Sequence, residues 1–327
     1  MNVISVSNLC KTFKVRQKQP GLINSIKSLF RSEYKEIKAV DDISFDVKKG
    51  EVLGLIGPNG AGKSTTIKML TGLLYPTSGE VHVLGYNPWK ERKKLLYKLG
   101  VIFGQRSQLW YHLPPSDTFN LIRNIYDIPK ETFEERLAYL SEFFDIKNLM
   151  NNPVRKLSLG QRMRVEFMAS LLHNPEVLFL DEPTIGMDIV VKQNVRNLIK
   201  QINQKEGKTI FLTSHDIGDI EKLCKRVIII NYGKIVFDGK LATLIKNYVH
   251  SKYIQVKLAS PLKALKYDGA TIIEQPSKYS VSFELNLKRA KLSDFIDFLT
   301  DNLDIVDLNV EDAPLEEIIA RIYKEKM

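Results

Sequence analysis

The sequence predicts a two-part α/β protein, with a large domain built on a largely parallel sheet and a small C-terminal α+β domain. Short apolar strands alternate with helical segments along the first part, as in VLFLD at 177–181 and TIFLTSH at 209–215. This alternation is typical of a parallel sheet covered by helices. After about Leu241 the strands alternate apolar and polar residues with period two. We therefore expect one domain over 1–240 and a second over 241–327.

The first domain is expected to begin with strands. Val3–Val6 and Ile43–Val47 alternate apolar and polar residues, as half-buried strands do, and Glu51–Ile56 has the composition of a buried strand. Lys63–Leu74 has a helical pattern. From about 106 to 175 the pattern is mainly helical and is interrupted by prolines. The segment RVIIINYGKIVFDGK then predicts two further strands.

The second domain combines strands with helices. YIQVKL and YSVSFEL alternate with period two, and DIVDLNV and LEEIIARIY follow them. Between them Leu292, Phe295, Ile296, Leu299 and Leu303 have helical spacing. The sequence leaves two roles open for this domain, a brace or cover for a dimer and a regulatory ligand site.

Composition narrows the class of partner. The chain has 327 residues, 44% of them hydrophobic, and a formal net charge of +10, so phosphate ligands, nucleic acid or an anionic membrane surface would suit it. The two cysteines, Cys10 and Cys224, are far apart in sequence and form no disulfide framework, which indicates that the protein works in a reducing cytosol. No apolar run approaches the ~18 residues of a membrane helix, and the N-terminus does not have the pattern of a signal peptide. If the protein works at a membrane, another chain is expected to cross it.

A glycine-rich run carries the strongest chemical signal. GPNGAGKST contains Gly57-x-x-x-x-Gly62-Lys63-Ser64, the Walker A pattern, after a buried strand and before a helix. Glycines let the backbone amides wrap a phosphate chain, and the helix directs its positive end at the same anion. Lys63 would bind the outer phosphates and Ser64 a Mg²⁺ ion. The alternative is a structural turn without a ligand.

Two further motifs place polar groups at the ends of elements. Asp181 and Glu182 follow the apolar strand VLFL, where one carboxylate can hold a metal's water shell and the other can polarise an attacking water. In KLSLGQRMRVEF, Ser158 precedes a helical pattern, so that Gly160 and Gln161 would lie at an N-terminal, anion-binding end. A capped structural helix is the alternative for the second motif.

Together these motifs resemble the ATP-binding subunit of an ABC transporter. Walker A, the Gln105 of VIFGQR, LSLGQ, VLFLDEP, IGMD and TSHD occur in that family's order over about three quarters of the chain. The resemblance implies a mixed-sheet core, a small antiparallel β subdomain and a helical subdomain over about 106–175. The overall sequence, with GVIFGQRSQLWYHLPPSDTF and APLEEIIARIY, looks most like the ABC-2 exporter ATPases.

The resemblance also implies roles for individual residues, with ATP and Mg²⁺ as cofactors. Glu182, His215 and Lys63 would be catalytic, and Asp181 would hold Mg²⁺ with Ser64 and Gln105. ATP contacts would come from Phe13, Gly57, Pro58, Asn59, Gly60, Ala61, Gly62, Lys63, Ser64, Thr65 and Gln105. Ser158, Leu159, Gly160 and Gln161 would contact ATP in a partner's site, and Asp188 would lie in the loop that links two sites.

Two of these assignments carry an open point. Phe13 matches the aromatic residue that stacks on adenine, although a core aromatic would look the same in sequence. Leu159 replaces the first glycine of the family's commonest signature, LSGGQ, while Ser158 and Gly160 are kept. We expect ATPase competence to be retained, with the rate and the fine geometry affected.

The family resemblance implies a function in transport. In this family two ATPase domains together form two ATP sites, and the chain has one copy of each motif, so a second copy or a similar ATPase subunit is expected. Separate permease subunits are expected to move a substrate, in the export direction. The protein would lie peripherally on the cytoplasmic face of the membrane. The alternatives are a cytosolic ABC ATPase acting on nucleic acid or ribosomes, which the single domain disfavours, and a binding module with a dead site.

The segment Arg16–Ile37 interrupts the N-terminal strands. Leu22, Ile23, Ile26, Leu29 and Phe30 would share one side of a helix, and basic residues outnumber acidic ones. We expect residues 21–31 to contact the permease or the membrane surface; a helix packed on its own domain is the alternative. No nucleic-acid contact is expected.

Overall fold

The computed structural model describes residues 1–16, 34–104, 107–248, 251–262, 265–312 and 315–325. The chain divides into two compact units, Met1–Gly239 and Lys240–Met327. The division lies one residue from the boundary expected from the sequence. Of the insertion predicted over Arg16–Ile37, residues 17–33, which include 21–31, lie outside the described residues, as does Gln105. The two ends of the insertion, Arg16 and 34–37, are described and belong to two paired antiparallel strands.

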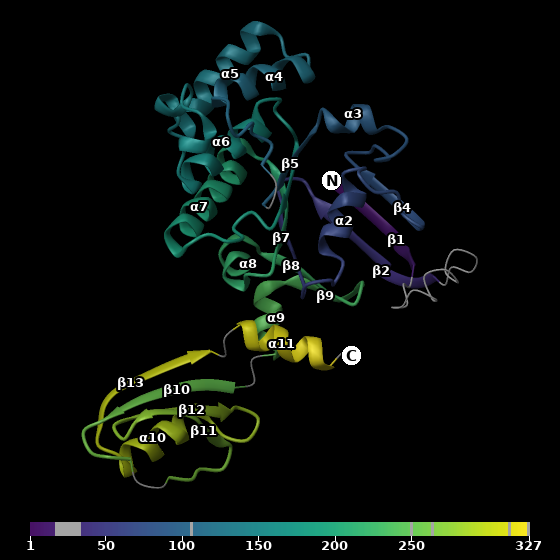
Figure 1. The fold of residues 1–327 in the computed structure, drawn as a ribbon. Helices are drawn as coiled ribbons and strands as arrows, with labels where there is room; N and C mark the ends of the chain where they lie inside the picture. Colours follow the sequence, from purple (N-terminus) through teal and green to yellow (C-terminus); the bar gives the residue numbers. More distant parts are fainter. Residues whose placement is uncertain (17–33, 105–106, 249–250, 263–264, 313–314, 326–327) are drawn as a thin grey trace, which may run out of the picture. The chain divides into compact units, whose positions relative to one another are not determined.

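The first unit is built on a six-stranded sheet with the order β5-β6-β7-β3-β8-β9 among the described strands (Figure 1). The strands are β3 (Val52–Ile56), β5 (Leu99–Phe103), β6 (Val177–Asp181), β7 (Thr209–Ser214), β8 (Arg226–Asn231) and β9 (Lys234–Lys240). The pairs from β5 to β8 are parallel, with Asp181 beside Thr213 and Ile56 beside Ser214. Their carboxyl ends therefore meet at one edge of the sheet.

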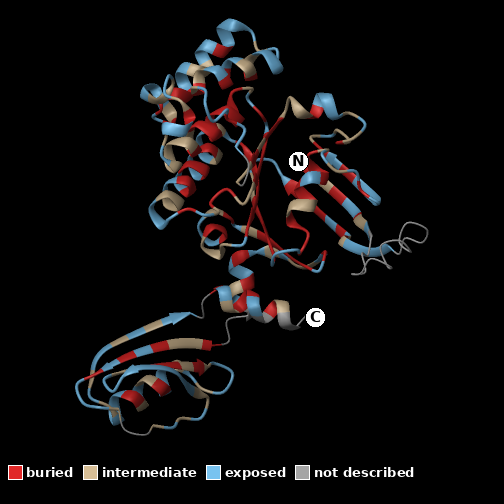
Figure 2. Cartoon of the chain, in the orientation of Figure 1, coloured by how far each residue is buried: buried red, intermediate tan, exposed pale blue. Residues whose placement is uncertain are grey.

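Helices cover both faces of this sheet because its strands are apolar on both faces. They are α2 (Lys63–Leu70), α3 (Arg92–Leu96), α6 (Leu159–Leu171), α7 (Ile189–Glu206) and α8 (Ile217–Leu223). Leu53 and Leu55 of β3 join the core cluster that contains Ile67 of α2. The position between them, Gly54, faces Ile220 of α8, so α2 and α8 pack on opposite faces. Figure 2 shows the buried residues concentrated along these strands.

A second sheet lies against α2. It has the order β2-β1-β4, with β1 (Asn2–Arg16), β2 (Tyr34–Lys48) and β4 (Ser78–Val83), and both of its pairings are antiparallel. α2 contacts β2 and β4 on one side and β6 on the other. The α/β fold and the small antiparallel sheet expected from the sequence are confirmed.

The region between β5 and β6 is helical, as the sequence pattern over about 106–175 predicted. It contains α4 (Pro115–Ile125), α5 (Lys130–Phe143) and the 3₁₀ turns Lys147–Leu149 and Val154–Lys156, before α6. Pro115 is the first residue of α4 and Pro129 the N-cap of α5, positions where the missing N–H costs no helical hydrogen bond. No helix among the described residues is long and apolar enough to cross a membrane.

The second unit has a four-stranded antiparallel sheet with the order β11-β12-β10-β13. Its elements are α9 (Leu241–Tyr248), β10 (Ser251–Leu258), β11 (Ala270–Ser277), β12 (Ser280–Asn286), α10 (Leu292–Asn302), β13 (Ile305–Asp312) and α11 (Leu315–Glu325). Phe295 and Leu299 of α10 are buried in one cluster with Val256 of β10 and Phe283 of β12. The α+β class expected for this part is observed, with β11 as an additional edge strand.

Candidate active site

The loop Gly57–Gly62 joins β3 to α2 at the carboxyl edge of the parallel strands. A Cβ at Gly57 would lie 2.4 Å from the Ile230 carbonyl oxygen, and one at Gly62 would lie 2.4 Å from the Ala39 carbonyl oxygen. Gly62 also has a φ of 111°, a conformation that favours glycine. These close approaches explain why the loop needs glycine at both ends. The N-cap residue of α2 is Gly62, which has no side chain to accept a hydrogen bond from the first amides of the helix.

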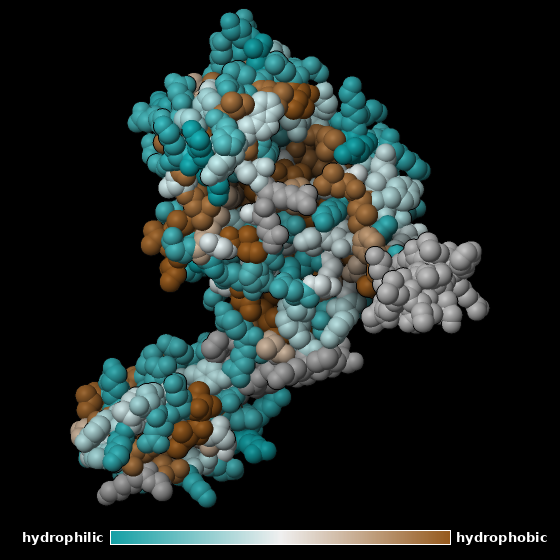
Figure 3. All heavy atoms as spheres, in the orientation of Figure 1, coloured by the Kyte–Doolittle hydropathy of each residue, from teal (hydrophilic) through white to brown (hydrophobic). Residues whose placement is uncertain are grey.

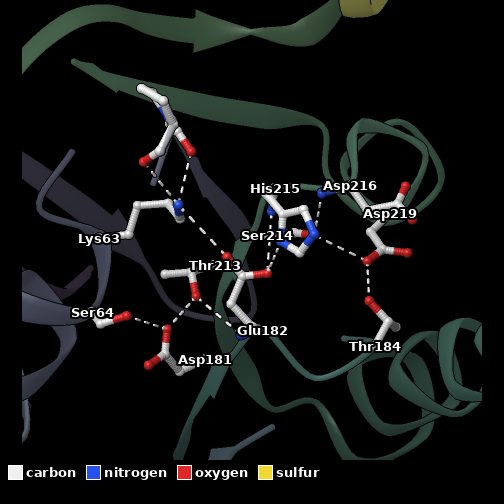
Figure 4. Close-up of polar contacts among 12 residues, drawn as sticks. Lys63, Ser64, Asp181, Glu182, Thr184, Thr213, Ser214, His215, Asp216 and Asp219 are labelled. Atoms are coloured by element: carbon white, nitrogen blue, oxygen red, sulfur yellow. Dashed lines mark hydrogen bonds and ion pairs between the residues drawn. The ribbon is translucent and has the colours of Figure 1, made fainter. Parts of the chain in front are cut away.

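Lys63 is the first residue of α2 and folds back over the loop. Its ammonium donates to the carbonyl oxygens of Gly57 at 2.8 Å and Pro58 at 3.3 Å. It also lies 3.6 Å from Oε1 of Glu182, with only 6% of its side chain exposed (Figure 4). The loop therefore holds a buried positive charge beside a carboxylate.

A hydroxyl and a carboxylate meet below Lys63. Oδ1 of Asp181, at the end of β6, accepts hydrogen bonds from Ser64 Oγ at 3.1 Å and from Thr213 Oγ1 at 2.6 Å (Figure 4). Mg²⁺ prefers such hard oxygen ligands and usually keeps waters and substrate phosphates in the rest of its shell. Ser64 and Asp181 therefore fit a Mg²⁺ ion bound with a phosphate chain.

Glu182 has an unusual backbone conformation. Its φ is 54°, in the left-handed region that non-glycine residues rarely adopt. Its amide donates to both the carbonyl and the hydroxyl oxygen of Thr213 at 3.1 Å. A Cβ at Gly104 would lie 2.0 Å from the Glu182 carbonyl oxygen. Strain of this kind is characteristic of functional sites, and here the neighbouring strands hold it in place.

The Glu182 carboxylate also contacts His215. Oε2 of Glu182 lies 2.5 Å from His215 Nδ1 and 3.3 Å from the His215 amide nitrogen. For this contact to be a hydrogen bond to a carboxylate, which only accepts, the proton must be on Nδ1 of His215. The histidine ring is half exposed and the carboxylate only 14% exposed. Glu182 is thereby fixed between a lysine and a histidine.

These groups line one cavity of about 410 Å³. Its walls are Asn59, Gly60, Ala61, Gly62, Lys63, Ser64, Thr65, Glu182, Ile185 and His215. An adjoining cavity of about 270 Å³ reaches Asp181 and Gly104. The structure thus brings the loop, Asp181, Glu182 and His215 together, far as they are in sequence. Such an arrangement can bind a phosphate chain and direct a water at it.

Other residues singled out in the sequence lie elsewhere. Ser158 caps α6, with Gln161 completing a capping box, and Leu159 and Gly160 form the first turn. Asp188 caps α7 by accepting from the Val191 amide at 2.9 Å. None of these residues lines either cavity.

Phe13 lies on β1, half-buried and opposite Ile37 of β2. The Lys11 ammonium sits 5.2 Å from the centre of the Phe13 ring, a cation–π contact. Phe13 does not line either cavity, and Gln105 lies outside the described residues. The role of Phe13 as an adenine contact therefore stays a prediction.

The sequence reasoning missed two residues that shape the site, Thr213 and Gly104. Thr213 supports both acidic residues through its hydroxyl, and Gly104 leaves room for the Glu182 peptide. A signal existed for Thr213, because it is a polar residue at the end of an apolar strand.

Comparisons with known proteins all point to the same family. A family model described as ABC transporter matches residues 40–185. The ABC transporter ATP-binding protein NatA of Bacillus subtilis (strain 168) is 34% identical over 66% of this chain and 87% of its own. The bacitracin transport ATP-binding protein BcrA of Bacillus licheniformis is 35% identical over 71% of this chain and 74% of its own. The linearmycin resistance ATP-binding protein LnrL of Bacillus subtilis is 29% identical over 89% and 96%.

Solved structures show the same fold. A dimeric ATP-binding cassette, MJ0796, in a post-hydrolysis state bound to ADP and Pi, is 25% identical, with a TM-score of 0.59, and covers 73% of this chain and 98% of its own. The ADP conformation of the cassette MJ1267 matches with a TM-score of 0.62 at 25% identity, over 76% and 94% of the two chains.

Proposed function

The chain belongs to the ABC transporter family, and from this premise we propose that it is the subunit that hydrolyses ATP to drive an exporter. It is an ABC-type ATPase and binds ATP. The observation that best supports a competent site is the Glu182 carboxylate, held between Lys63 and His215 at a cavity walled by the phosphate loop.

In the proposed reaction Glu182 orients and polarises the attacking water. Lys63 and the amides of Gly60–Ser64 bind the phosphates, so that Lys63 exchanges its loop carbonyls for phosphate oxygens. Ser64 and Asp181 would hold Mg²⁺, which neutralises phosphate charge. His215, which lines the same cavity, would contact the outer phosphate. For this, its ring must either break the hydrogen bond to Glu182 or donate through Nε2.

A second subunit would complete each site. Ser158–Gln161 lie at the start of a helix but not in the cavity that holds the loop, so another copy's helix end must supply the contact to the outer phosphate. All the catalytic positions of this chain are filled, so that a pair of identical copies would have two competent sites, which favours a second copy of itself over a similar subunit. Similarity to the dimeric cassette MJ0796 supports the pairing.

Transport requires a membrane partner. Trp110, Tyr111 and Leu113, a few residues after Gln105, expose 49%, 55% and 36% of their surfaces. Figure 3 shows apolar residues at the surface around the place where Figure 1 draws β5. Exposed aromatic groups of this kind mark interaction sites, and permease subunits are the proposed partner. The protein would then lie peripherally on the cytoplasmic face.

The export direction is proposed from the relatives. Three of them are named for bacitracin transport, linearmycin resistance and Nod factor export. The domains 1–240 and 241–327, and a membrane or permease contact through 21–31, remain proposals on sequence grounds.

Purification from its own membranes tests this function. The tagged chain, extracted in mild detergent, should carry a polytopic membrane protein, and the complex in lipid vesicles should show ATPase activity stimulated by the transported compound. Recovery with ribosomes or nucleic acid, and without a membrane protein, would instead support the non-transport alternative.

A further inference from the structure

A group of charged and hydroxyl side chains lies behind the active site, on the side away from the phosphate loop. Asp219 of α8 is fully buried and accepts from Arg196 Nε of α7 at 2.6 Å. Its other oxygen accepts from the hydroxyls of Thr184 and Ser214, the latter at 3.1 Å (Figure 4). A carboxylate with this many partners is held in one position.

The two hydroxyl partners of Asp219 lie beside the catalytic residues Glu182 and His215, in the two catalytic loops. Thr184 is two residues beyond Glu182, and Ser214 immediately precedes His215. Ser214 Oγ also accepts from the amide of Asp216, the residue that follows His215, at 2.9 Å. Both loops are therefore tied to the same buried carboxylate.

α7 supplies the positive charges of this group. Lys192 Nζ donates to Asp216 Oδ2, and Arg196 Nη2 lies 3.4 Å from Asp216 Oδ1. Burial alone would raise the pKa of Asp216, but Lys192 and Arg196 hold that pKa below its ordinary value, so Asp216 stays charged. α7 thus holds Asp216, on one side of His215, directly, and Ser214, on the other side, only through Asp219.

The same stripe of α7 begins at Asp188. Asp188, Lys192 and Arg196 are spaced four residues apart, which places them on one side of the helix. Asp188 caps the helix, so a displacement of its loop moves the helix end to which Lys192 is attached. A rigid, hydrogen-bonded element can carry such a displacement to the residues it holds.

We propose that Lys192 and Arg196 are positioning residues for His215, which couple the loop of Asp188 to the catalytic loops through Asp216 and Asp219. The inference rests on the proposed pairing of two subunits, because a partner that contacts the Asp188 loop would be the source of the displacement. Lys192 is the adjustable member of the group, since its contact with Asp216 is partly exposed, whereas the Arg196–Asp219 pair is buried.

Lys192→Met tests the proposal without leaving a buried charge unpaired, because Asp216 keeps Arg196. We expect kcat for ATP hydrolysis to fall by about tenfold or more, as a misplaced catalytic group produces, with KM within about twofold of wild type. Lys192→Arg should restore most of the rate. Lys200→Met, two turns further along α7 at an exposed lysine for which the described structure gives no ion pair, is the matched control and should leave kcat unchanged.

A double-mutant cycle separates positioning from general damage. If Lys192 acts through His215, Lys192→Met should cost less than about twofold in a His215→Ala background, measured by single-turnover hydrolysis. An equal loss in both backgrounds, or a Lys192→Met rate equal to that of Lys200→Met, would overturn the proposal. A wild-type protein that fails to hydrolyse ATP would instead refute the proposed function. Thermal unfolding of each variant shows whether a loss of rate comes from unfolding.

Discussion

Replacing Glu182 by Gln keeps the shape of the side chain and removes its charge. In the structure the two carboxylate oxygens face Lys63 at 3.6 Å and His215 Nδ1 at 2.5 Å. Lys63 keeps its bonds to the carbonyl oxygens of Gly57 and Pro58 in the variant, so the phosphate loop should hold its conformation. The variant should therefore bind MgATP and fail to hydrolyse it.

The expected sizes of the two effects differ. Loss of a general base typically lowers the rate by about 10²–10⁴-fold. Stability should fall by only about 1 kcal/mol, because Lys63 retains two acceptors; in a domain of this size that corresponds to a shift in Tm of about 2–4 °C. ATP at about 100 times its Kd should stabilise both proteins by about 2.7 kcal/mol.

Phosphate release gives the rate, and thermal unfolding with and without MgATP gives binding and stability. Glu176→Gln is the control, because Glu176 precedes the opposite end of β6 and forms an exposed ion pair with Lys98; its rate should match wild type. Hydrolysis by the Glu182 variant at the wild-type rate, or loss of ATP binding with an intact fold, would refute the assignment.

Three further predictions follow from the structure. Thr213→Val removes a buried hydroxyl that bonds to Asp181 and to the Glu182 amide, and should cost about 1.5–3 kcal/mol of stability. It should also raise the Mg²⁺ concentration needed for half-maximal ATPase activity, and an unchanged Mg²⁺ dependence would argue against Asp181 as a metal ligand. Burial lowers the pKa of His173 from 6.5 to about 4, so this group costs the native state about 2 kcal/mol as the pH falls from 7.5 to 5. His173→Gln should remove that loss in urea titrations at the two pH values, and a variant as acid-sensitive as wild type would contradict the buried, neutral histidine. A chain ending at Lys240 should keep nucleotide binding and lose dimer stability or transport coupling; a folded truncation that cannot bind ATP would contradict the domain boundary.

Much of the site could be predicted because its signals are local. Gly57, Gly62 and Lys63 form a contiguous pattern whose backbone demands are met by glycine, and Asp181 and Glu182 end an apolar strand. Each motif lies at the carboxyl end of a parallel strand, and that topology brings the motifs together.

Contacts that depend on register could not be read from the sequence. Thr213 supports Asp181 only because β7 lies beside β6 with these two residues paired, and Gly104 approaches Glu182 only because β5 pairs with β6. The ion pairs of α7 with Asp216 and Asp219 depend on helix packing in the same way.

Two differences in the elements have local causes. The helix expected over 63–74 ends at Leu70, because Gly72 adopts a φ of 71° and turns the chain. β11 was not expected, since nearly all its residues are exposed at the edge of the sheet and Pro276 interrupts its pattern.

The central claim, that two copies of this chain share each ATP site, is tested most directly by mixing two inactive variants. Lys63→Ala disables the phosphate loop and Ser158→Phe blocks the helix end that a partner would offer, so each variant alone should be inactive. In an equimolar mixture half of the pairs are mixed and each contains one intact site, which predicts ATPase activity at about a quarter of the wild-type rate. A mixture as inactive as its two components would contradict the shared site.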